Sequence, residues 1–200
     1  MDTDTGAEQV YWDLSDLYTS PDDPALVRDM KRVGEMASEF SQSYKNKLAY
    51  LNAAELHGAL QRYEAIQDLM ARIGSYAYLN WTTNTEDAAL GKLVQQTNEL
   101  GSELSQQLVF FDIEWLALPE KDAQALVNSK KLSGYHHYLK TSRAFKPYIL
   151  SEEQEQVLSA KSVAGKQAWT RYFDETLGAA RFQRDGRELS EQEVLSKLHQ

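Results

Sequence analysis

Apolar side chains recur every three or four residues along most of this chain, the spacing of one face of an α-helix. The first such stripe follows Asp23 and Pro24 and comprises Leu26, Met30, Val33, Ala37, Phe40, Tyr44 and Leu48. Asp23 is the expected N-cap, and Pro24 suits the first helical position because the N–H that proline lacks would have no partner there. The pattern therefore predicts a long helix that begins at Pro24.

Two further stripes predict two more long helices. The second stripe comprises Leu56, Leu60, Tyr63, Ile66, Met70, Ile73 and Ala77. The third follows Thr85, its expected cap, ends before Pro119, and comprises Leu90, Leu93, Thr97, Leu100, Leu104, Leu108, Phe111 and Trp115. At roughly twenty to thirty residues each, these helices exceed the mean length of ~11–12 residues. Long helices joined by short polar links are typical of antiparallel bundles.

A sustained spacing of three and four residues also occurs in coiled coils, which bury only a narrow seam. Here aromatic side chains flank the stripe and widen it beyond such a seam; they are Tyr63, Tyr76, Tyr78 and Trp81. We therefore expect an all-α fold, a globular bundle of long antiparallel helices.

The last third of the chain carries the clearest local signals. Shorter helices are expected over Lys121–Val127 and near Tyr135–Lys140. Ser151 with Gln154, and later Ser190 with Glu193, have the spacing of a capping box, so each pair predicts the start of a helix.

Between these two helix starts, residues 181–184 alternate in polarity and Asp185-Gly186 is a turn dipeptide. This combination predicts a short β-hairpin near residues 180–189, with an extended connector between helices as the alternative. The helix that starts at Ser190 has only just begun at Gln200. We therefore expect the chain to be the front part of a larger protein.

Composition narrows the classes of protein to which the chain can belong. Its 200 residues include 21 basic and 30 acidic side chains, for a net charge of −9. This balance disfavours a nucleic-acid partner, because such binding requires Lys and Arg to displace counterions from phosphates. No apolar run reaches the ~18–20 residues of a membrane span, so no membrane partner is expected.

Compartment is indicated by the N-terminus and by the absence of cysteine. The first six residues are acidic and polar, whereas a secretory signal has a basic start and an apolar stretch. With no cysteine in the sequence, disulfides, thiol catalysis and cysteine-ligated metals are excluded. We expect a cytoplasmic protein.

The four histidines, His57, His136, His137 and His199, do not form a metal motif. No two have the spacing of His-Glu-x-x-His, and none follows a glutamate by three residues as in di-iron bundles. Adjacent His136 and His137 would point about 100° apart on a helix, so we expect partly exposed polar side chains. Glycine-rich phosphate loops and a Gly-x-Ser-x-Gly nucleophile are also missing from the sequence.

One charge asymmetry remains. Residues 123–151 contain no Asp or Glu but five basic side chains, a local charge of +5, with four aromatic residues interleaved. One interpretation is a solvated face that offsets acidic neighbours. The other is a basic-aromatic wall that holds the carboxylates or the C-terminus of a peptide. Its candidate peptide contacts are Lys140, Arg143, Lys146 and Tyr148.

A series of motifs runs in a fixed order from one end of the chain to the other. They are Trp12-Asp13-Leu14-Ser15-Asp16-Leu17-Tyr18, Pro147, Leu150-Ser151, Glu152-Glu153, Ala168-Trp169, Gly186 and Leu189-Ser190 with Glu193. In this order and at these separations they resemble the N-terminal region of the oligoendopeptidase F family, zinc oligopeptidases related to thimet oligopeptidase. The acidic pair directly after Ser151 departs slightly from the usual spacing.

This resemblance implies a two-lobed, mostly helical metallopeptidase with a deep substrate channel. In that family an HExxH helix and a downstream Glu hold the zinc ion, and none of these ligands has a counterpart in residues 1–200. We therefore assign no catalytic and no metal residue in this chain. Residues 1–200 are expected to be the N-terminal helical lobe that narrows the channel, with the catalytic domain and its zinc outside the chain.

The expected partners are oligopeptide substrates and the missing catalytic domain. By itself the chain should be catalytically inactive and bind no zinc. It should also self-associate through its C-terminal helices, because separating a lobe from its partner uncovers apolar surface. The alternative is a non-enzymatic helical protein-interaction module that docks through the basic-aromatic stretch.

Overall fold

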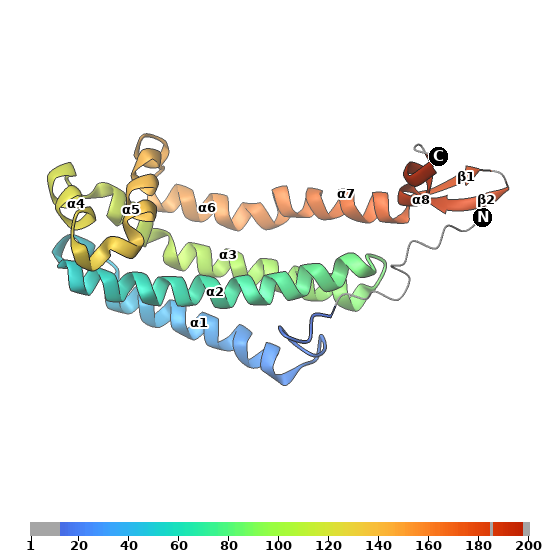
Figure 1. Ribbon diagram of the computed structural model, residues 1–200, viewed down its shortest axis with the longest axis horizontal. Coiled ribbons are helices and arrows are strands. Elements are labelled where there is room, and N and C mark those ends of the chain that lie inside the picture. Colours follow the sequence, from blue (N-terminus) through green and yellow to red (C-terminus); the bar gives the residue numbers. More distant parts are fainter. Residues whose placement is uncertain (1–12, 185, 198–200) are drawn as a thin grey trace.

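Three long helices lie side by side and form the body of the molecule (Figure 1). The computed structural model describes residues 13–184 and 186–197. Helices α1 (Pro24–Tyr44), α2 (Ala53–Thr83) and α3 (Ala88–Ala117) each pack against the other two. The predicted all-α bundle is confirmed, and the three helices have 21, 31 and 30 residues, close to the predicted lengths.

The start of each long helix is fixed by a side chain that accepts backbone N–H groups. Asp23 caps α1 as predicted, with its carboxylate 2.7 Å from the amide nitrogen of Ala25. Asn52 and Glu55 form a capping box at the start of α2. The predicted cap of α3, Thr85, is wrong. Asp87 takes that role because its carboxylate accepts two amides, and the helix therefore begins two residues later than Thr85 would place it.

Thr85 has a different neighbour. A Cβ added to Gly178 of α7 (Ala168–Ala179) would lie 2.6 Å from the Thr85 hydroxyl oxygen. The absence of a side chain at Gly178 thus lets α7 pass close to the link between α2 and α3.

Aromatic side chains fill the middle of the bundle. Phe40 lies within 5.9 Å of the rings of Tyr44, Tyr63, Phe110 and Phe111, measured between centroids. Such tilted and edge-to-face pairs add to the free energy gained from burial alone. Of the four aromatic residues that widen the second stripe, Tyr63 belongs to this cluster, Tyr76 and Trp81 are buried elsewhere in the core, and Tyr78 is exposed.

The link between α1 and α2 is anchored on α3. The α1 stripe extends to Leu48, but the helix ends at Tyr44, and Asn46 adopts a left-handed backbone with φ of 64°. The Glu114 carboxylate accepts the amide N–H groups of Asn46 and Leu48. This bond pair fixes the turn and places Leu48 in the core.

Short helices cover one end of the bundle (Figure 1). They are α4 (Glu120–Val127), the 3₁₀ segment η2 (Lys130–Tyr135), α5 (His136–Ser142) and the 3₁₀ segment η3 (Arg143–Tyr148). The two predicted short helices are confirmed as α4 and α5. The 3₁₀ segments around α5 were not predicted.

The chain then returns along α3 as one long rod with a local irregularity. Helix α6 (Glu152–Ser162) passes through a π-helical turn, η4 (Val163–Gln167), into α7, and Gly165 has a non-helical backbone in that turn. Packing of α6 on α3 is close enough for Ser102 and Ser159 each to donate its hydroxyl to the backbone carbonyl of the other, at 2.9 and 3.3 Å. The Ser151–Gln154 capping box that starts α6 is confirmed.

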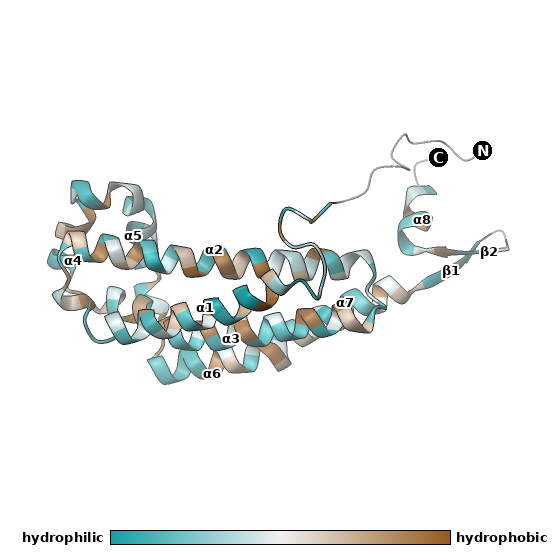
Figure 2. Cartoon of the chain, turned by 90° about the horizontal axis from the view of Figure 1, so that it is seen from below, coloured by the Kyte–Doolittle hydropathy of each residue, from teal (hydrophilic) through white to brown (hydrophobic). Residues whose placement is uncertain are grey.

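Beyond the rod lie a β-hairpin and a last helix, away from the bundle in both views (Figures 1 and 2). Strands β1 (Arg181–Arg184) and β2 (Arg187–Ser190) pair antiparallel, with Phe182 opposite Leu189. Gly186 has a positive φ of 73°, which a glycine adopts without strain. The predicted hairpin is thus confirmed, although Asp185 of its turn lies outside the described residues. Helix α8 (Glu191–Ser196) starts at the predicted Ser190–Glu193 capping box.

Candidate functional site

The predicted basic-aromatic stretch folds into α5 and η3, at the end of the bundle where α3 terminates. The structure does not gather its four candidate peptide contacts into one cluster. Two cations turn toward the end of α3, a third is exposed on α5, and Tyr148 borders a groove. The basic and the aromatic parts of the stretch therefore have different surroundings.

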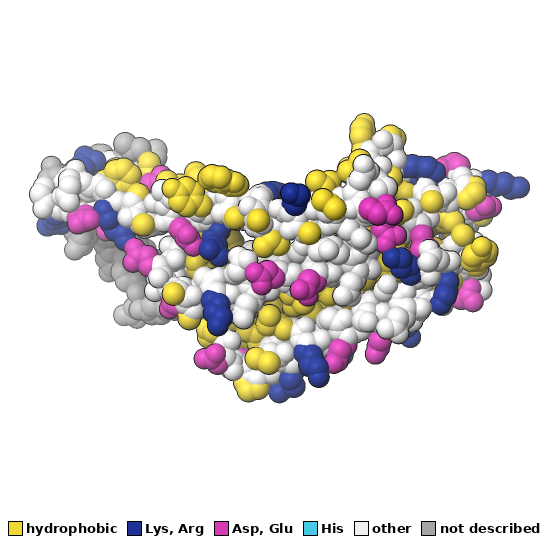
Figure 3. All heavy atoms as spheres, turned by 180° about the vertical axis from the view of Figure 1, so that it is seen from behind, with side chains coloured by type: hydrophobic (Ala, Val, Ile, Leu, Met, Phe, Trp, Pro, Cys, Tyr) yellow, Lys and Arg dark blue, Asp and Glu magenta, His cyan; other side chains and the backbone are white. Residues whose placement is uncertain are grey.

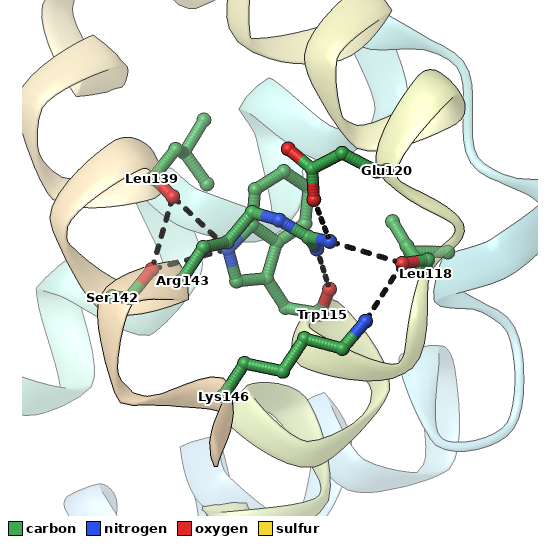
Figure 4. Close-up of polar contacts among 7 residues, drawn as sticks. All are labelled: Trp115, Leu118, Glu120, Leu139, Ser142, Arg143 and Lys146. Carbon is green, nitrogen blue, oxygen red and sulfur yellow. Dashed lines mark hydrogen bonds and ion pairs between the residues drawn. The ribbon is translucent and has the colours of Figure 1, made fainter.

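Arg143 reaches across the C-terminus of α3 (Figure 4). Its guanidinium donates to the carbonyl oxygens of Trp115 at 2.8 Å and Leu118 at 3.1 Å. It also lies 5.5 Å from the Trp115 ring centroid and pairs with the Glu120 carboxylate at 2.8 Å. The side chain is only 9% exposed. These contacts satisfy carbonyls that a helix end leaves unpaired and place a positive charge at the negative end of its dipole.

Trp115 connects the same site to α5. Its indole N–H lies 3.1 Å from the Ser142 hydroxyl and 3.3 Å from the Leu139 carbonyl (Figure 4). The ring is buried, so these acceptors replace the water that the indole N–H would otherwise bond. Arg143 and Trp115 together join α3, α5 and η3.

The two lysines among the candidate peptide contacts differ in their hydrogen bonds. Lys146 extends toward the Leu118 carbonyl oxygen at 3.4 Å, the same acceptor that Arg143 uses (Figure 4). Lys140 is exposed on α5, and no hydrogen bond or ion pair joins it to another described residue.

Three of the four aromatic side chains of the stretch, Tyr138, Phe145 and Tyr148, line a groove of about 650 Å³ between α3, α5, η3 and α6. We call it the Asp112 groove. Its lining residues are Val109, Asp112, Leu116, His137, Tyr138, Thr141, Ser142, Phe145, Tyr148, Ile149 and Glu155. Phe145 and Tyr148 are 63% and 78% exposed, which leaves much of each ring available for contact.

Asp112 is the half-buried charge of this groove. Its carboxylate accepts a hydrogen bond from the Tyr138 hydroxyl at 3.2 Å, and no cation pairs with it among the described residues. Burial raises the pKa of Asp112, and the bond from Tyr138 opposes that rise. Burial and the neighbouring Asp112 charge in turn raise the pKa of Tyr138, so its hydroxyl stays a donor at neutral pH.

A smaller hollow of about 180 Å³ between α2 and α3 reaches Asp112 from another side. It shares Val109 and Asp112 with the groove and includes Tyr63, whose pKa burial also raises. Asp112 therefore lines both hollows.

Sequence reasoning missed Asp112, Glu155 and His137 as groove residues. Asp112 interrupts the apolar run Leu108–Ile113, and a carboxylate so close to a helix's buried face is a signal that could have identified it. Glu155 lies in the first turn of α6, where its carboxylate accepts the amide N–H of Leu150 at 3.2 Å.

No three His, Asp or Glu side chains of the described residues are grouped so that they could hold a metal ion. His57 packs edge-on against Tyr135, with centroids 5.7 Å apart, and His136 and His137 are exposed. His199 lies outside the described residues. No described helix combines the length and apolarity needed to cross a bilayer.

A second surface feature runs along α6 and α7. Hydrophobic side chains gather on the edge of the molecule that these helices form (Figure 3). We call this the α6–α7 face; its large apolar residues, each 53–71% exposed, are Val157, Leu158, Trp169, Tyr172 and Phe173. Exposed apolar patches of this kind are typical of surfaces that contact another protein, a membrane or a ligand.

Comparisons with known proteins relate the sequence of this chain to one peptidase family. Residues 114–182 match a family model described as Oligopeptidase F. The chain is also 26% identical over 152 residues to Oligopeptidase PepF of Bacillus subtilis, a match that covers 76% of this chain and 22% of the relative. The chain thus spans about a fifth of the length of this curated relative. No solved structure matches it significantly. Both matches confirm that this chain resembles the N-terminal region of the oligoendopeptidase F family.

Proposed function

We propose that the chain is the N-terminal helical domain of a larger zinc metalloendopeptidase that hydrolyses oligopeptides. The proposal rests on the match to Oligopeptidase F and on the identity to Oligopeptidase PepF over 76% of the chain. In this proposal the domain covers the substrate channel, so that short peptides enter and folded proteins do not. The catalytic domain hydrolyses the peptide bond.

The observation that supports this role best is where the exposed apolar surface lies. All five residues of the α6–α7 face fall within residues 114–182, as do the exposed rings of Phe145 and Tyr148. The segment that matches the peptidase family is therefore also the segment whose apolar side chains lack a cover. A catalytic domain packed on α6 and α7 would supply that cover.

The described residues do not fit a zinc site, since no three potential ligands are grouped among them. We therefore assign no step of the hydrolysis to zinc bound by this chain. In the proposed whole protein the metal is held by the catalytic part, where it would polarise the scissile carbonyl and the attacking water.

Contacts of this domain with the peptide remain part of the proposal. Tyr148 is suited to such a contact because it is exposed at the rim of the Asp112 groove, and Lys140 because its ammonium is exposed and bonds to none of the described residues. Arg143 and Lys146 would first have to release the carbonyls at the end of α3.

The proposal is tested by the longer polypeptide that contains this chain. The reading frame after Gln200 should encode a His-Glu-x-x-His helix, and the purified protein should cleave a short internally quenched peptide while leaving a folded protein of similar composition intact. A stop codon at this point would favour the protein-interaction module instead. Equal cleavage of the folded protein would contradict the channel-covering role.

A further inference from the structure

The Asp112 groove is acidic, although the sequence around it carries a positive charge. Its charged lining side chains are the carboxylates of Asp112 and Glu155, with His137 beside them. The nearby cations Arg143 and Lys146 bond to the carbonyls at the end of α3 instead. The hollow itself is therefore acidic, inside a stretch of sequence that is basic.

Asp112 has unused capacity to accept hydrogen bonds. An ionised carboxylate offers about four lone-pair positions, and in the described structure Asp112 receives one bond, from the neutral Tyr138 hydroxyl. A half-buried carboxylate without a cation is unfavourable, and the raised pKa of Asp112 reflects that cost. A cation that entered the groove and paired with Asp112 would remove this unfavourable free energy.

The walls of the groove suit the same ligand. The rings of Tyr138, Phe145 and Tyr148 all line it. Aromatic faces attract cations through their quadrupole, and their apolar surface suits the methylene stem of a long side chain. A carboxylate among aromatic walls favours an extended side chain with a terminal positive charge.

We propose that the Asp112 groove binds the cationic side chain of a Lys or Arg residue in an oligopeptide. The ammonium or guanidinium donates to the free oxygen positions of Asp112, and the stem lies against Tyr148 and Phe145. This inference deepens the proposed function, because its ligand is the oligopeptide substrate. It assigns this domain a preference for basic side chains at one position of the peptide.

The test uses the 200-residue chain and two blocked tripeptides, acetyl-Ala-Lys-Ala-amide and the same peptide with Nε-acetyl-lysine. Binding is measured by NMR titration. We expect the lysine peptide to bind about tenfold more tightly than the acetylated one, because acetylation removes the charge that Asp112 accepts. Signals of residues that line the groove should shift.

Substitutions locate the effect. Asp112→Asn should bind both peptides equally weakly, because it removes the carboxylate's charge and keeps its shape. Tyr148→Ala should weaken binding of the lysine peptide about threefold through loss of its exposed ring. The matched control is Glu103→Gln, which makes the same change of charge at an exposed position of α3 and should bind like the unaltered chain.

Two results would overturn the proposal. One is equal binding of both peptides by the unaltered chain. The other is selective binding by the isolated chain that disappears in the longer polypeptide, which would show that the groove receives a cation from the rest of that protein. Neither result depends on catalysis, so failure here is distinguishable from failure of the proposed peptidase, which is judged by hydrolysis.

Discussion

At the scale of single residues, Arg143 and Asp112 are the two side chains whose surroundings differ most from what their sequence neighbourhood suggests. Arg143 belongs to a basic stretch, yet it is 9% exposed and holds the end of α3. Asp112 belongs to an apolar helix segment, yet it faces two hollows. Each leads to a measurable consequence for stability.

Replacing Arg143 by Met should lower the free energy of unfolding by about 2–3 kcal/mol, because two buried carbonyls lose a charged donor. The ion pair with Glu120 contributes little, since the Glu120 side chain is 75% exposed. Urea unfolding followed by tryptophan fluorescence measures the effect. Lys140→Met is the control on neighbouring α5 and should change stability by less than about 0.5 kcal/mol. Equal effects of both substitutions would contradict the role assigned to Arg143.

The titration of Asp112 should make the free energy of unfolding depend on pH, and the direction of that dependence can be predicted. Burial raises the pKa of the Asp112 carboxyl above its ordinary value, so the folded protein binds this proton more tightly than the unfolded chain does. The contribution of protonated Asp112 to the free energy of unfolding is complete below the pKa of the unfolded chain. It is lost as the pH rises through the raised pKa of the folded protein. The free energy of unfolding of the unaltered chain, minus that of Asp112→Asn, should therefore fall as the pH rises from about 4, the ordinary pKa of an aspartate, toward neutrality. Urea titrations of both proteins across this range measure it, and a difference that rises with pH would contradict the assignment.

At the scale of elements, the connections between helices depend on contacts between residues far apart in sequence. Glu114 of α3 holds the turn between α1 and α2 through two backbone amides 68 and 66 residues away. Glu114→Ala should lower the free energy of unfolding by about 1–3 kcal/mol, because those amides lose a charged acceptor. Glu103→Ala, an exposed change on the same helix, should have little effect. Similar unfolding midpoints for the two variants in urea would contradict this anchoring role.

Local signals predicted the elements better than the site. Asp23, Ser151 and Ser190 act within their own helix turns, so their caps could be identified from spacing alone. The left-handed Asn46 and the Asp112 groove depend on segments that meet only in the folded chain. The same holds for the basic-aromatic stretch. Its composition could be read from the sequence, but the direction of the Arg143 side chain is set by the carbonyls at the end of α3.

At the scale of the whole molecule, the α6–α7 face is the feature that most needs a cover. The isolated chain should therefore self-associate through it, because burying these apolar side chains between copies is favourable. Trp169→Glu with Phe173→Glu should shift the chain toward monomer in sedimentation experiments. The control is Tyr50→Glu, at a position that is 84% exposed and outside this face. A monomer at high concentration for the unaltered chain would contradict the prediction.

Hydrolysis of an internally quenched oligopeptide by the longer polypeptide, measured before and after metal removal by a chelator, tests the proposed function most directly. We predict that the longer polypeptide cleaves the peptide, that the chelator abolishes cleavage and that added zinc restores it. The 200-residue chain, assayed beside it, should cleave nothing and retain no zinc after dialysis. Chelator-sensitive cleavage by the isolated chain, or no cleavage by the longer polypeptide, would contradict the assignment of this chain as a non-catalytic domain of a zinc oligopeptidase.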